Sequence, residues 1–394
     1  MASVYRAVTA GRLVPSPTAL ASVTVLAMDP VRVGIIGCGN ISNAYLNACR
    51  RFASLTVTAV ADLDAARAQH KAAEFGLSAL TPEALLADPS IELVINLTVP
   101  MAHAEVSRRA LAAGKHVYSE KPLATELAHG EALVALARER GLRLGCAPDT
   151  FLGGGLQTCR KLLDDGWLGT PVAATAFMMS RGPESWHPNP FFFYQPGGGP
   201  LLDMAPYYLT AIINLLGPVR RVVSMARRSF ETRRATSKEL YGTIIPVEVE
   251  THVVGVLEHQ GGAISTLITT FDVAASELPR LEVYGSEGTL SAPDPNTFGG
   301  PVRLRRWGAE SWSELPISHG YRTGNWRGLG AADLAQALRT GRPQRASGDL
   351  AYHVLEVMLA ILAAAHSGQA QTLTSTVARP APLPLGLLEG ELDD

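Results

Sequence analysis

A strand-like run that ends in a glycine-rich turn is the feature that most constrains this chain. Residues 31–36 read VRVGII, an apolar run typical of a buried parallel strand, and the segment GCGNIS follows directly at 37–42. Its first glycine permits a tight turn, and its second lets a pyrophosphate approach the backbone. A helix that begins at about residue 41 would direct unpaired N–H groups at the phosphates. We therefore predict a dinucleotide-binding turn, with contacts from Gly37, Gly39, Asn40 and Ile41.

A carboxylate follows the second predicted strand, which covers residues 55–61. Asp62 lies 20 residues beyond Ser42, where a carboxylate is expected to accept hydrogen bonds from the hydroxyls of the adenosine ribose. It would also repel a 2′-phosphate. Leu63 stands where an NADP site is expected to place Arg or Ser, and Arg67 has a simple interpretation as a solvated helix residue. These residues predict NAD rather than NADP as the cofactor. The alternative to a cofactor site is a plain βα turn with a surface aspartate.

Strand-like and helix-like segments alternate through the first 150 residues. After the first two strands, further strands are predicted over 93–97, 116–119 and 142–147. The helices between them are predicted over 64–75, 102–113 and 125–140. Short connections in this order indicate right-handed βαβ units. We therefore expect an α/β Rossmann domain, a doubly wound parallel sheet, over residues 29–149.

The pattern changes near residue 148. Beyond it, strands are predicted over 172–179, 219–225, 247–257, 264–271 and 281–284. Helices are predicted over 155–165, 202–215, 328–340 and 348–366. The linkers at 260–262 and 286–288 are hairpin-like, which indicates a large, mainly antiparallel sheet. We expect an α+β substrate, catalytic and oligomerisation domain over 150–378 and an irregular tail over 379–394.

Composition and the first residues narrow the class of protein. Three interpretations of residues 1–28 stay open: a true start at Met28, which we prefer, a disordered extension, and a targeting segment. The net charge of −2 offers no basic field for nucleic acid, and no uninterrupted apolar run reaches the ~18 residues of a membrane span. Four cysteines lack metal-ligand spacing. We expect a cytoplasmic enzyme without a metal.

A second cluster, GKHVYSEKP, covers residues 114–122. It places Lys121 at the C-terminal end of a predicted parallel strand, which is the edge of the sheet where ligands bind. Between Glu120 and Pro122 its ammonium could hydrogen-bond an alkoxide or donate a proton to a carbonyl as hydride arrives. From these residues alone, a solvated surface lysine is an equally good interpretation.

Together these segments resemble the glucose–fructose oxidoreductase, inositol dehydrogenase and rhizopine catabolism (Gfo/Idh/MocA) family. In the first half the resemblance is carried by the glycine turn, by TVPMAH at 98–103 and by GKHVYSEKPLA at 114–124. In the second half it is carried by DDGWLG at 164–169, GGGPLLDM at 197–204 and YGSEGTL at 284–290. The likeness covers nearly the whole chain, from about residue 31 to past residue 345.

This resemblance implies hydride transfer between NAD and a hydroxyl or carbonyl carbon of a sugar, cyclitol or related polyol. It implies a lysine, here Lys121, with an aspartate and a histidine one helical turn apart. Asp203 matches the aspartate, but the histidine position is occupied by Tyr207, four residues on and on the same helix face. Either Tyr207 is the acid/base, with its pKa lowered by the ammonium of Lys121, or Lys121 carries the proton and Tyr207 only orients the substrate.

Further site residues are assigned with the help of the resemblance. To the cofactor site it adds Thr98, Pro100, His103, Glu120 and Lys121, although His103 also has a simpler interpretation as a hydrogen-bonding residue at a helix start. Candidate substrate residues are Trp186, His187 and Gln195 ahead of the GGG turn, and Trp326 and Arg327 from the C-terminal side. A wide sheet must cover its free face, so with the resemblance we expect a homodimer or homotetramer.

Two other functions use the same residues. A redox-neutral enzyme would retain NAD through oxidation, elimination or hydrolysis, and re-reduction. A non-catalytic NAD-binding regulator would need neither Lys121 nor Asp203. The presence of both residues argues against a regulator, whereas the missing histidine argues weakly for one.

Overall fold

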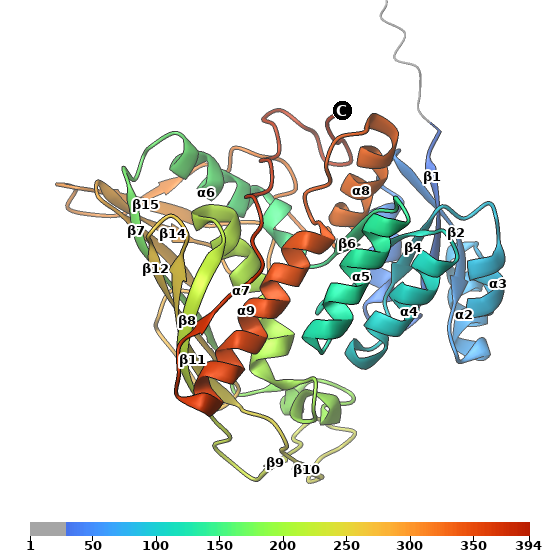
Figure 1. Ribbon diagram of the computed structural model, residues 1–394, viewed down its shortest axis with the longest axis horizontal. Coiled ribbons are helices and arrows are strands. Elements are labelled where there is room, and N and C mark those ends of the chain that lie inside the picture. The colour runs from blue at the N-terminus through green and yellow to red at the C-terminus, as the bar shows by residue number, and fades with distance from the viewer. Residues whose placement is uncertain (1–28) are drawn as a thin grey trace, which may run out of the picture.

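The computed structural model describes residues 29–394 and has two sheets with helices packed around and between them (Figure 1). Residues 1–28, for which the sequence left three interpretations open, lie outside the described residues. The first sheet contains only parallel strands, and the second is mixed but mainly antiparallel. The two sheets confirm the predicted fold class, a Rossmann sheet followed by an α+β arrangement.

The first sheet has the strand order β3-β2-β1-β4-β5-β6. Its strands are β1 (Val31–Ile36), β2 (Leu55–Ala61), β3 (Ser78–Leu80), β4 (Leu93–Asn96), β5 (His116–Ser119) and β6 (Leu144–Cys146). The short edge strand β3 and helix α3 (Pro82–Ala87) were not predicted from the sequence. The direction of strand addition reverses between β1 and β4. In open parallel sheets, ligands bind outside the carboxyl ends of the strands at such a point.

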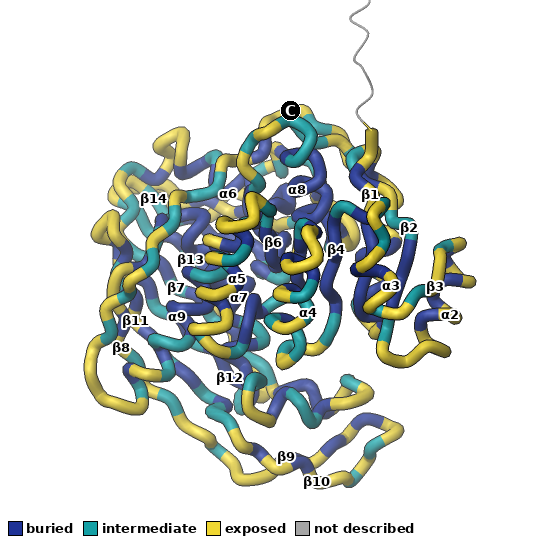
Figure 2. Tube along the Cα trace, turned by 45° about the vertical axis from the view of Figure 1, so that its right-hand side comes forward, coloured by how far each residue is buried: buried dark blue, intermediate teal, exposed yellow. Residues whose placement is uncertain are grey.

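Helices cover both faces of this sheet. One face carries α1 (Ser42–Cys49) and α2 (Ala65–Phe75), and the other carries α3, α4 (Pro100–Ala112) and α5 (Leu127–Glu139). Helix α8 (Leu329–Thr340) also packs on the first of these faces, against α1, β2, β5 and β6, and most of its residues are buried (Figure 2). The predicted second domain, residues 150–378, includes this helix, but its tertiary contacts place it on the first sheet.

The second sheet has the order β16-β15-β14-β13-β7-β12-β11-β8-β17. Its strands are β7 (Pro171–Met179), β8 (Val219–Arg227), β11 (His252–His259), β12 (Ile264–Thr270), β13 (Leu281–Gly285), β14 (Gly288–Ala292), β15 (Val302–Arg306), β16 (Ser313–Leu315) and β17 (Gln371–Thr372). All neighbours are antiparallel except β7 and β12, which run parallel. Strand β11 begins at His252 rather than at the predicted residue 247. The amides of Val247 and Glu248 instead donate to carbonyls of Glu231 and Tyr194.

One face of the second sheet is covered by α6 (Gly154–Asp164), α7 (Gly199–Leu216) and α9 (Gly348–Ser367), which lie between the two sheets in Figure 1. The opposite face of the sheet exposes apolar side chains. A separate hairpin of β9 (Thr232–Arg234) and β10 (Ile244–Pro246) extends from the end of β8. Three short 3₁₀ turns complete the fold: η1 (Thr150–Leu152), η2 (Pro183–Ser185) and η3 (Phe191–Tyr194).

Helix α9 is long and apolar enough to span a membrane by length and composition alone, and it is the one such helix among residues 29–394. However, 56 % of its most apolar window is buried inside the protein. It packs against β8, α5 and α7. These contacts are those of a core helix that joins the two sheets.

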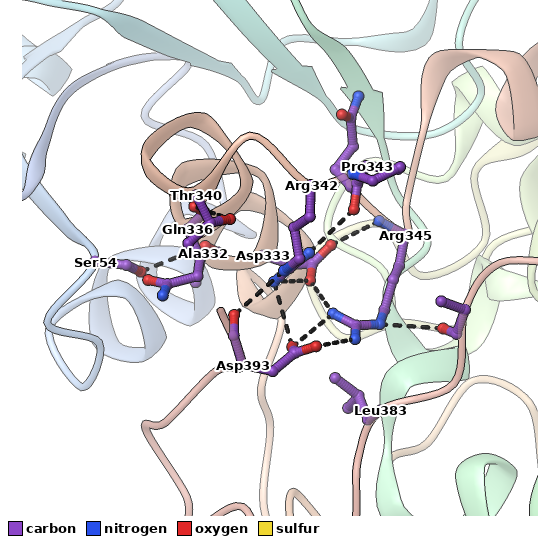
Figure 3. Close-up of polar contacts among 12 residues, drawn as sticks. Ser54, Ala332, Asp333, Gln336, Thr340, Arg342, Pro343, Arg345, Leu383 and Asp393 are labelled. Carbon is purple, nitrogen blue, oxygen red and sulfur yellow. Dashed lines mark hydrogen bonds and ion pairs between the residues drawn. The ribbon is translucent and has the colours of Figure 1, made fainter.

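The C-terminal tail has no regular secondary structure after residue 378, yet it is held by buried ion pairs (Figure 3). The guanidinium of Arg345 lies 2.6 Å from Asp333 of α8 and 2.6 Å from Asp393 of the tail. Farther back, the amide of Leu383 donates to Gln157 of α6 at 2.7 Å. The tail therefore ties helices on the two sheets together.

Candidate active site

A cavity of about 570 Å³ lies between the carboxyl ends of the first sheet and helix α7. Segments far apart in the sequence meet in it: the glycine turn, the segments after β4 and β5, η2 with the loop that follows, and α7. Of the residues predicted from the sequence, those that line it are Asn40, Ile41, Thr98, Pro100, His103, Glu120, Lys121, Trp186, His187, Asp203 and Tyr207. The structure thus joins the predicted cofactor and catalytic segments in one cavity.

The glycine turn leaves room for a dinucleotide. Gly37 has a φ of +108°, and a Cβ there would lie 2.5 Å from the backbone of Leu97, so the fold itself requires this glycine. A Cβ on Gly39 would meet nothing within 4 Å, so internal packing does not explain the second glycine. Ile41, at the N-terminus of α1, provides no side-chain cap for the first N–H groups of the helix. Open space beside free N–H donors fits a pyrophosphate.

Asp62 is held rigidly at the end of β2. Its Oδ2 accepts a hydrogen bond from the amide of Cys38 in the glycine turn at 2.8 Å, and its Oδ1 accepts from the amide of Asp64 at 2.9 Å. Carboxylate oxygens can accept more than one hydrogen bond, so both can still receive ribose hydroxyls. The guanidinium of Arg67 lies 3.7 Å from Asp62 and 3.5 Å from Asp64. The Arg67 side chain is 54 % exposed, which fits its interpretation as a solvated helix residue, and it lies beside the expected ribose position.

Lys121 forms a close ion pair across the cavity. Its Nζ donates to Oδ1 of Asp203 at 2.6 Å and to the carbonyl oxygen of Asp203 at 2.8 Å. Burial alone would lower the pKa of Lys121, but the negative charge of Asp203, together with Tyr207 and Glu120, outweighs burial and raises this pKa above its ordinary value. Lys121 is therefore an ammonium at neutral pH, able to donate a proton but not to accept one.

Tyr207 shares the cavity-facing side of α7 with Asp203. Its ring centroid lies 5.3 Å from Nζ of Lys121. Burial raises the pKa of Tyr207 above its ordinary value, although Lys121 and Arg327 both act to lower it. The expectation that the neighbouring ammonium would lower this pKa was wrong in net direction, because the loss of solvent around the phenol has the larger effect. The phenol is therefore neutral at pH 7.

Two further predicted residues hold the walls of the cavity together. The carboxylate of Glu120 accepts from the hydroxyl of Tyr45 at 2.7 Å and from the amide of Lys121 at 3.0 Å. The imidazole of His103 has Nδ1 at 2.7 Å from the carbonyl oxygen of Pro122 and Nε2 at 3.0 Å from that of Thr98. Burial lowers the pKa of His103, and a neutral imidazole has a single N–H, so the ring donates to one of these two carbonyl oxygens. This contact fits the simpler interpretation of His103, even though its ring lines the cavity.

Three predicted substrate residues lie outside the cavity lining. Gln195 is exposed beyond it. Trp326 is fully buried, packs edge-on against Tyr321, and donates from Nε1 to the carbonyl oxygen of Thr323 at 2.8 Å. It is a core residue, and the prediction that it reaches substrate was wrong because aromatic character alone does not distinguish packing from binding. Arg327 does not line the cavity, but its guanidinium carbon lies 5.8 Å from the ring centroid of Tyr207, which does.

Other lining residues were not found from the sequence. Met178 and Met179 lie at the end of β7, and Phe271 follows β12. Both strands were predicted, but only their parallel pairing brings their carboxyl ends to the same edge. Polar residues from loops complete the set: Arg280, Asp294 and Asn296. No local motif marks these three.

Comparisons with known proteins identify the family and the fold. Residues 31–147 match the oxidoreductase family with an NAD-binding Rossmann fold, and residues 156–291 match the GFO/IDH/MocA C-terminal domain. An NAD binding oxidoreductase from Klebsiella pneumoniae has the same fold, with a TM-score of 0.77 at 22 % sequence identity. The alignment of the two structures covers 88 % of this chain and 100 % of that one.

Two relatives are named as sugar reductases. A 1,5-anhydro-D-fructose reductase from Ensifer adhaerens is 28 % identical over 347 residues, which cover 86 % of this chain and 97 % of the relative. A dTDP-3,4-didehydro-2,6-dideoxy-alpha-D-glucose 3-reductase from Saccharopolyspora spinosa is 30 % identical over 295 residues, which cover 73 % of this chain and 83 % of the relative. The chain is an NAD-binding oxidoreductase of the sugar oxidoreductase and dehydrogenase class, and it belongs to the Gfo/Idh/MocA family.

Proposed function

We propose that the protein transfers hydride between NAD and a hydroxyl or carbonyl carbon of a sugar, cyclitol or related polyol. The observation that carries this proposal is the meeting of the Lys121–Asp203 ion pair and the Tyr207 phenol in the cavity that Asn40 and Ile41 of the glycine turn also line. The two relatives, both named as sugar reductases, support a carbohydrate substrate.

Bound NAD would supply the hydride acceptor, or the hydride donor in its reduced form. For their part, the backbone at Gly39 and Ile41 would receive the pyrophosphate, and Asp62 would accept from the ribose hydroxyls. The fixed negative charge of Asp62 would disfavour a 2′-phosphate. This is the basis for proposing NAD rather than NADP as the preferred cofactor.

In the proposed reaction Tyr207 moves the proton. At neutral pH both Tyr207 and Lys121 keep their protons, so the resting site is prepared to donate a proton to a carbonyl oxygen during reduction. Lys121 would hydrogen-bond the same oxygen while Asp203 fixes its position. For oxidation the phenol must first lose its proton. We therefore expect oxidation to accelerate as the pH rises, and reduction to be the favoured direction near neutrality.

A substrate screen in both directions tests this function. NADH oxidation would be followed with keto-sugars, and NAD reduction with aldoses, inositols, glycosides and sugar acids. We expect turnover with at least one substrate class, NAD over NADP, and faster oxidation at alkaline pH. An absence of turnover in both directions, with NAD demonstrably bound, would contradict the proposal.

We also propose that the protein works in the cytoplasm as a homodimer or homotetramer. The support for an oligomer is the face of the second sheet opposite α9, where Val223, Met225 and Val256 are exposed on neighbouring strands. A second copy of the chain could cover this apolar face.

A further inference from the structure

We infer that Arg327 acts together with Lys121 to stabilise the phenolate of Tyr207, so that two cations flank the group that moves the substrate proton. This inference rests on the proposed function and extends it. Arg327 is not among the residues that line the cavity, so we assign it an electrostatic and positioning role that acts through Tyr207. It would also account for how a tyrosine can stand where the family pattern has a histidine.

The two cations reach the same ring from different parts of the fold. The guanidinium carbon of Arg327 lies 5.8 Å from the Tyr207 ring centroid, and Nζ of Lys121 lies 5.3 Å from it. Lys121 follows β5 in the first sheet, whereas Arg327 directly precedes Gly328 at the start of α8. Tyr207 lies on α7, so three separate elements meet at the phenol.

The two cations differ in how far their charge is already neutralised. Lys121 is paired with the carboxylate of Asp203 at 2.6 Å. Arg327, in contrast, has no carboxylate partner within 4.0 Å anywhere in residues 29–394. Its guanidinium donates to the amide oxygens of Asn296 at 2.6 Å and Asn325 at 3.1 Å, which orient it but carry no net charge. Arg327 thus keeps a full positive charge beside the phenol.

The backbone next to Arg327 is fixed by a buried carboxylate. Oδ2 of Asp149 accepts from the amides of Gly328 at 2.8 Å and Gly330 at 3.0 Å. Asp149 is 1 % exposed. These bonds hold the first turn of α8, and so the position from which Arg327 extends, without forming a direct ion pair with its side chain. The backbone and the neutral side-chain amides thus fix the position of the Arg327 guanidinium, so its positive charge acts on the Tyr207 phenol from a constant place.

Several charged groups face the phenol, and their signs matter for the test. Lys121 and Arg327 favour the phenolate, and Glu120 opposes it. Asp203 lies one turn away on the same helix, and His187 and Arg280 line the same cavity. A cation within about 4–6 Å typically lowers the pKa of an acidic group by ~1–3 units. Removing Arg327 should therefore raise the pH at which Tyr207 loses its proton by about 1–2 units.

Arg327→Met tests the inference through the pH profile of kcat for NAD-dependent oxidation. We expect its rising limb to move about 1–2 pH units to the alkaline side, with the Kd for NAD unchanged within about twofold. Arg327→Lys keeps the positive charge, so its rising limb should lie close to that of the wild-type enzyme. The matched control is Arg322→Met, which removes one positive charge from an exposed position of the same segment and should leave the limb in place.

A second measurement does not depend on activity. The phenol of Tyr207 can be titrated by ultraviolet absorbance of tyrosinate, as the difference between the wild-type enzyme and Tyr207→Phe, and again between Arg327→Met and the double variant Arg327→Met/Tyr207→Phe. A midpoint that is higher by about a unit without Arg327 supports the inference. Equal midpoints, or an unmoved kcat limb, would overturn it. If no substrate turns over, the proposed function fails while this titration still decides the role of Arg327.

Discussion

At the residue scale, the resemblance to the family implies a histidine at the position that Tyr207 occupies. Such an exchange would replace a group with an ordinary pKa of about 6.5 by one with an ordinary pKa of about 10. Burial moves the pKa of Tyr207 further upward, while Lys121 remains an ammonium paired with Asp203. If Tyr207 is the acid/base, as we propose, this exchange would change the pH at which a base becomes available, while the lysine–aspartate pair is present as the resemblance implies.

Removing the phenolic hydroxyl of Tyr207 should show whether this group carries the substrate proton. Tyr207→Phe keeps the ring and is expected to lower kcat by ~10²–10⁴ and to abolish the alkaline limb of the oxidation profile. Lys121→Ala should cause a loss of similar order with little change in NAD affinity, which fluorescence titration can measure. If kcat of Tyr207→Phe stays within about threefold of wild type at every pH, the phenol does not carry the proton.

Cofactor preference should depend on Asp62. We expect Asp62→Ala to weaken NAD binding and to narrow the gap to NADP, because it removes the ribose acceptor and frees Arg67, now 3.7 Å from Asp62, for a 2′-phosphate. The measurement is kcat/KM with each cofactor for both proteins. A wild-type preference for NADP of tenfold, or about 1.4 kcal/mol, would show that the ribose site is misassigned.

At the element scale, a buried network connects the β9–β10 hairpin to the cavity. Arg233 of β9 donates from Nε at 2.9 Å and from Nη2 at 2.6 Å to Glu184 of η2, and from Nη1 at 2.7 Å to Asp272. Glu184 also accepts from the hydroxyl of Tyr194. The residues on both sides of Glu184, Pro183 and Trp186 among them, line the cavity. The hairpin therefore braces the segment that we assign to substrate binding.

Removing the Arg233 ion pairs should weaken substrate binding more than cofactor binding. Arg233→Met leaves two buried carboxylates without their cation, so we expect KM for the sugar to rise by about tenfold or more, NAD affinity to be kept, and stability to fall by ~3–5 kcal/mol. Arg234→Met is the control, since it removes the same charge from the exposed side of the same strand. Equal KM values for the two variants would show that the network does not position the substrate segment.

At the scale of the whole molecule, two sheets of different construction share a packed interior. Helix α9 lies against β8 of the second sheet and against α5 on the first, and the tail ion pairs at Asp393 add a further connection. Figure 1 shows α7 and α9 between the two sheets, whereas α2 and α3 lie on the outer side of the first sheet. The other face of the second sheet is left with exposed apolar side chains, which a second copy can cover.

That face should contain the oligomer interface. Val223 lies opposite Val256 and Met225 opposite Val254 on neighbouring strands, and Met225 is 81 % exposed. We expect the double substitution Val223→Lys/Met225→Lys to shift the protein from dimer or tetramer toward monomer in sedimentation experiments, because buried like charges oppose association. Its thermal midpoint as a monomer should be little changed. Leu388→Lys, an exposed tail position, should leave the assembly intact, and an unchanged mass for the double variant would place the interface elsewhere.

Local sequence patterns were enough to predict the glycine turn, the carboxylate after the second strand and the helix face that carries Asp203 and Tyr207. The apolar run before Gly37, the spacing to Asp62 and the i, i+4 pair of Asp203 and Tyr207 are encoded within single turns or a single βαβ unit. The structure places these elements within a few residues of their predicted bounds. Short-range periodicity and turn chemistry act on neighbours in the chain, which is why they can be read without a fold.

Tertiary structure alone decided the rest. Only folding brings Arg327 beside Tyr207, buries Trp326 in the core, places α8 on the first sheet, and makes β7 and β12 parallel neighbours. The sign of the pKa shift at Tyr207 likewise depends on burial by groups from several elements. Each of these outcomes is a contact between segments far apart in the sequence, and the free energy that selects such contacts belongs to the packed interior as a whole rather than to any local pattern.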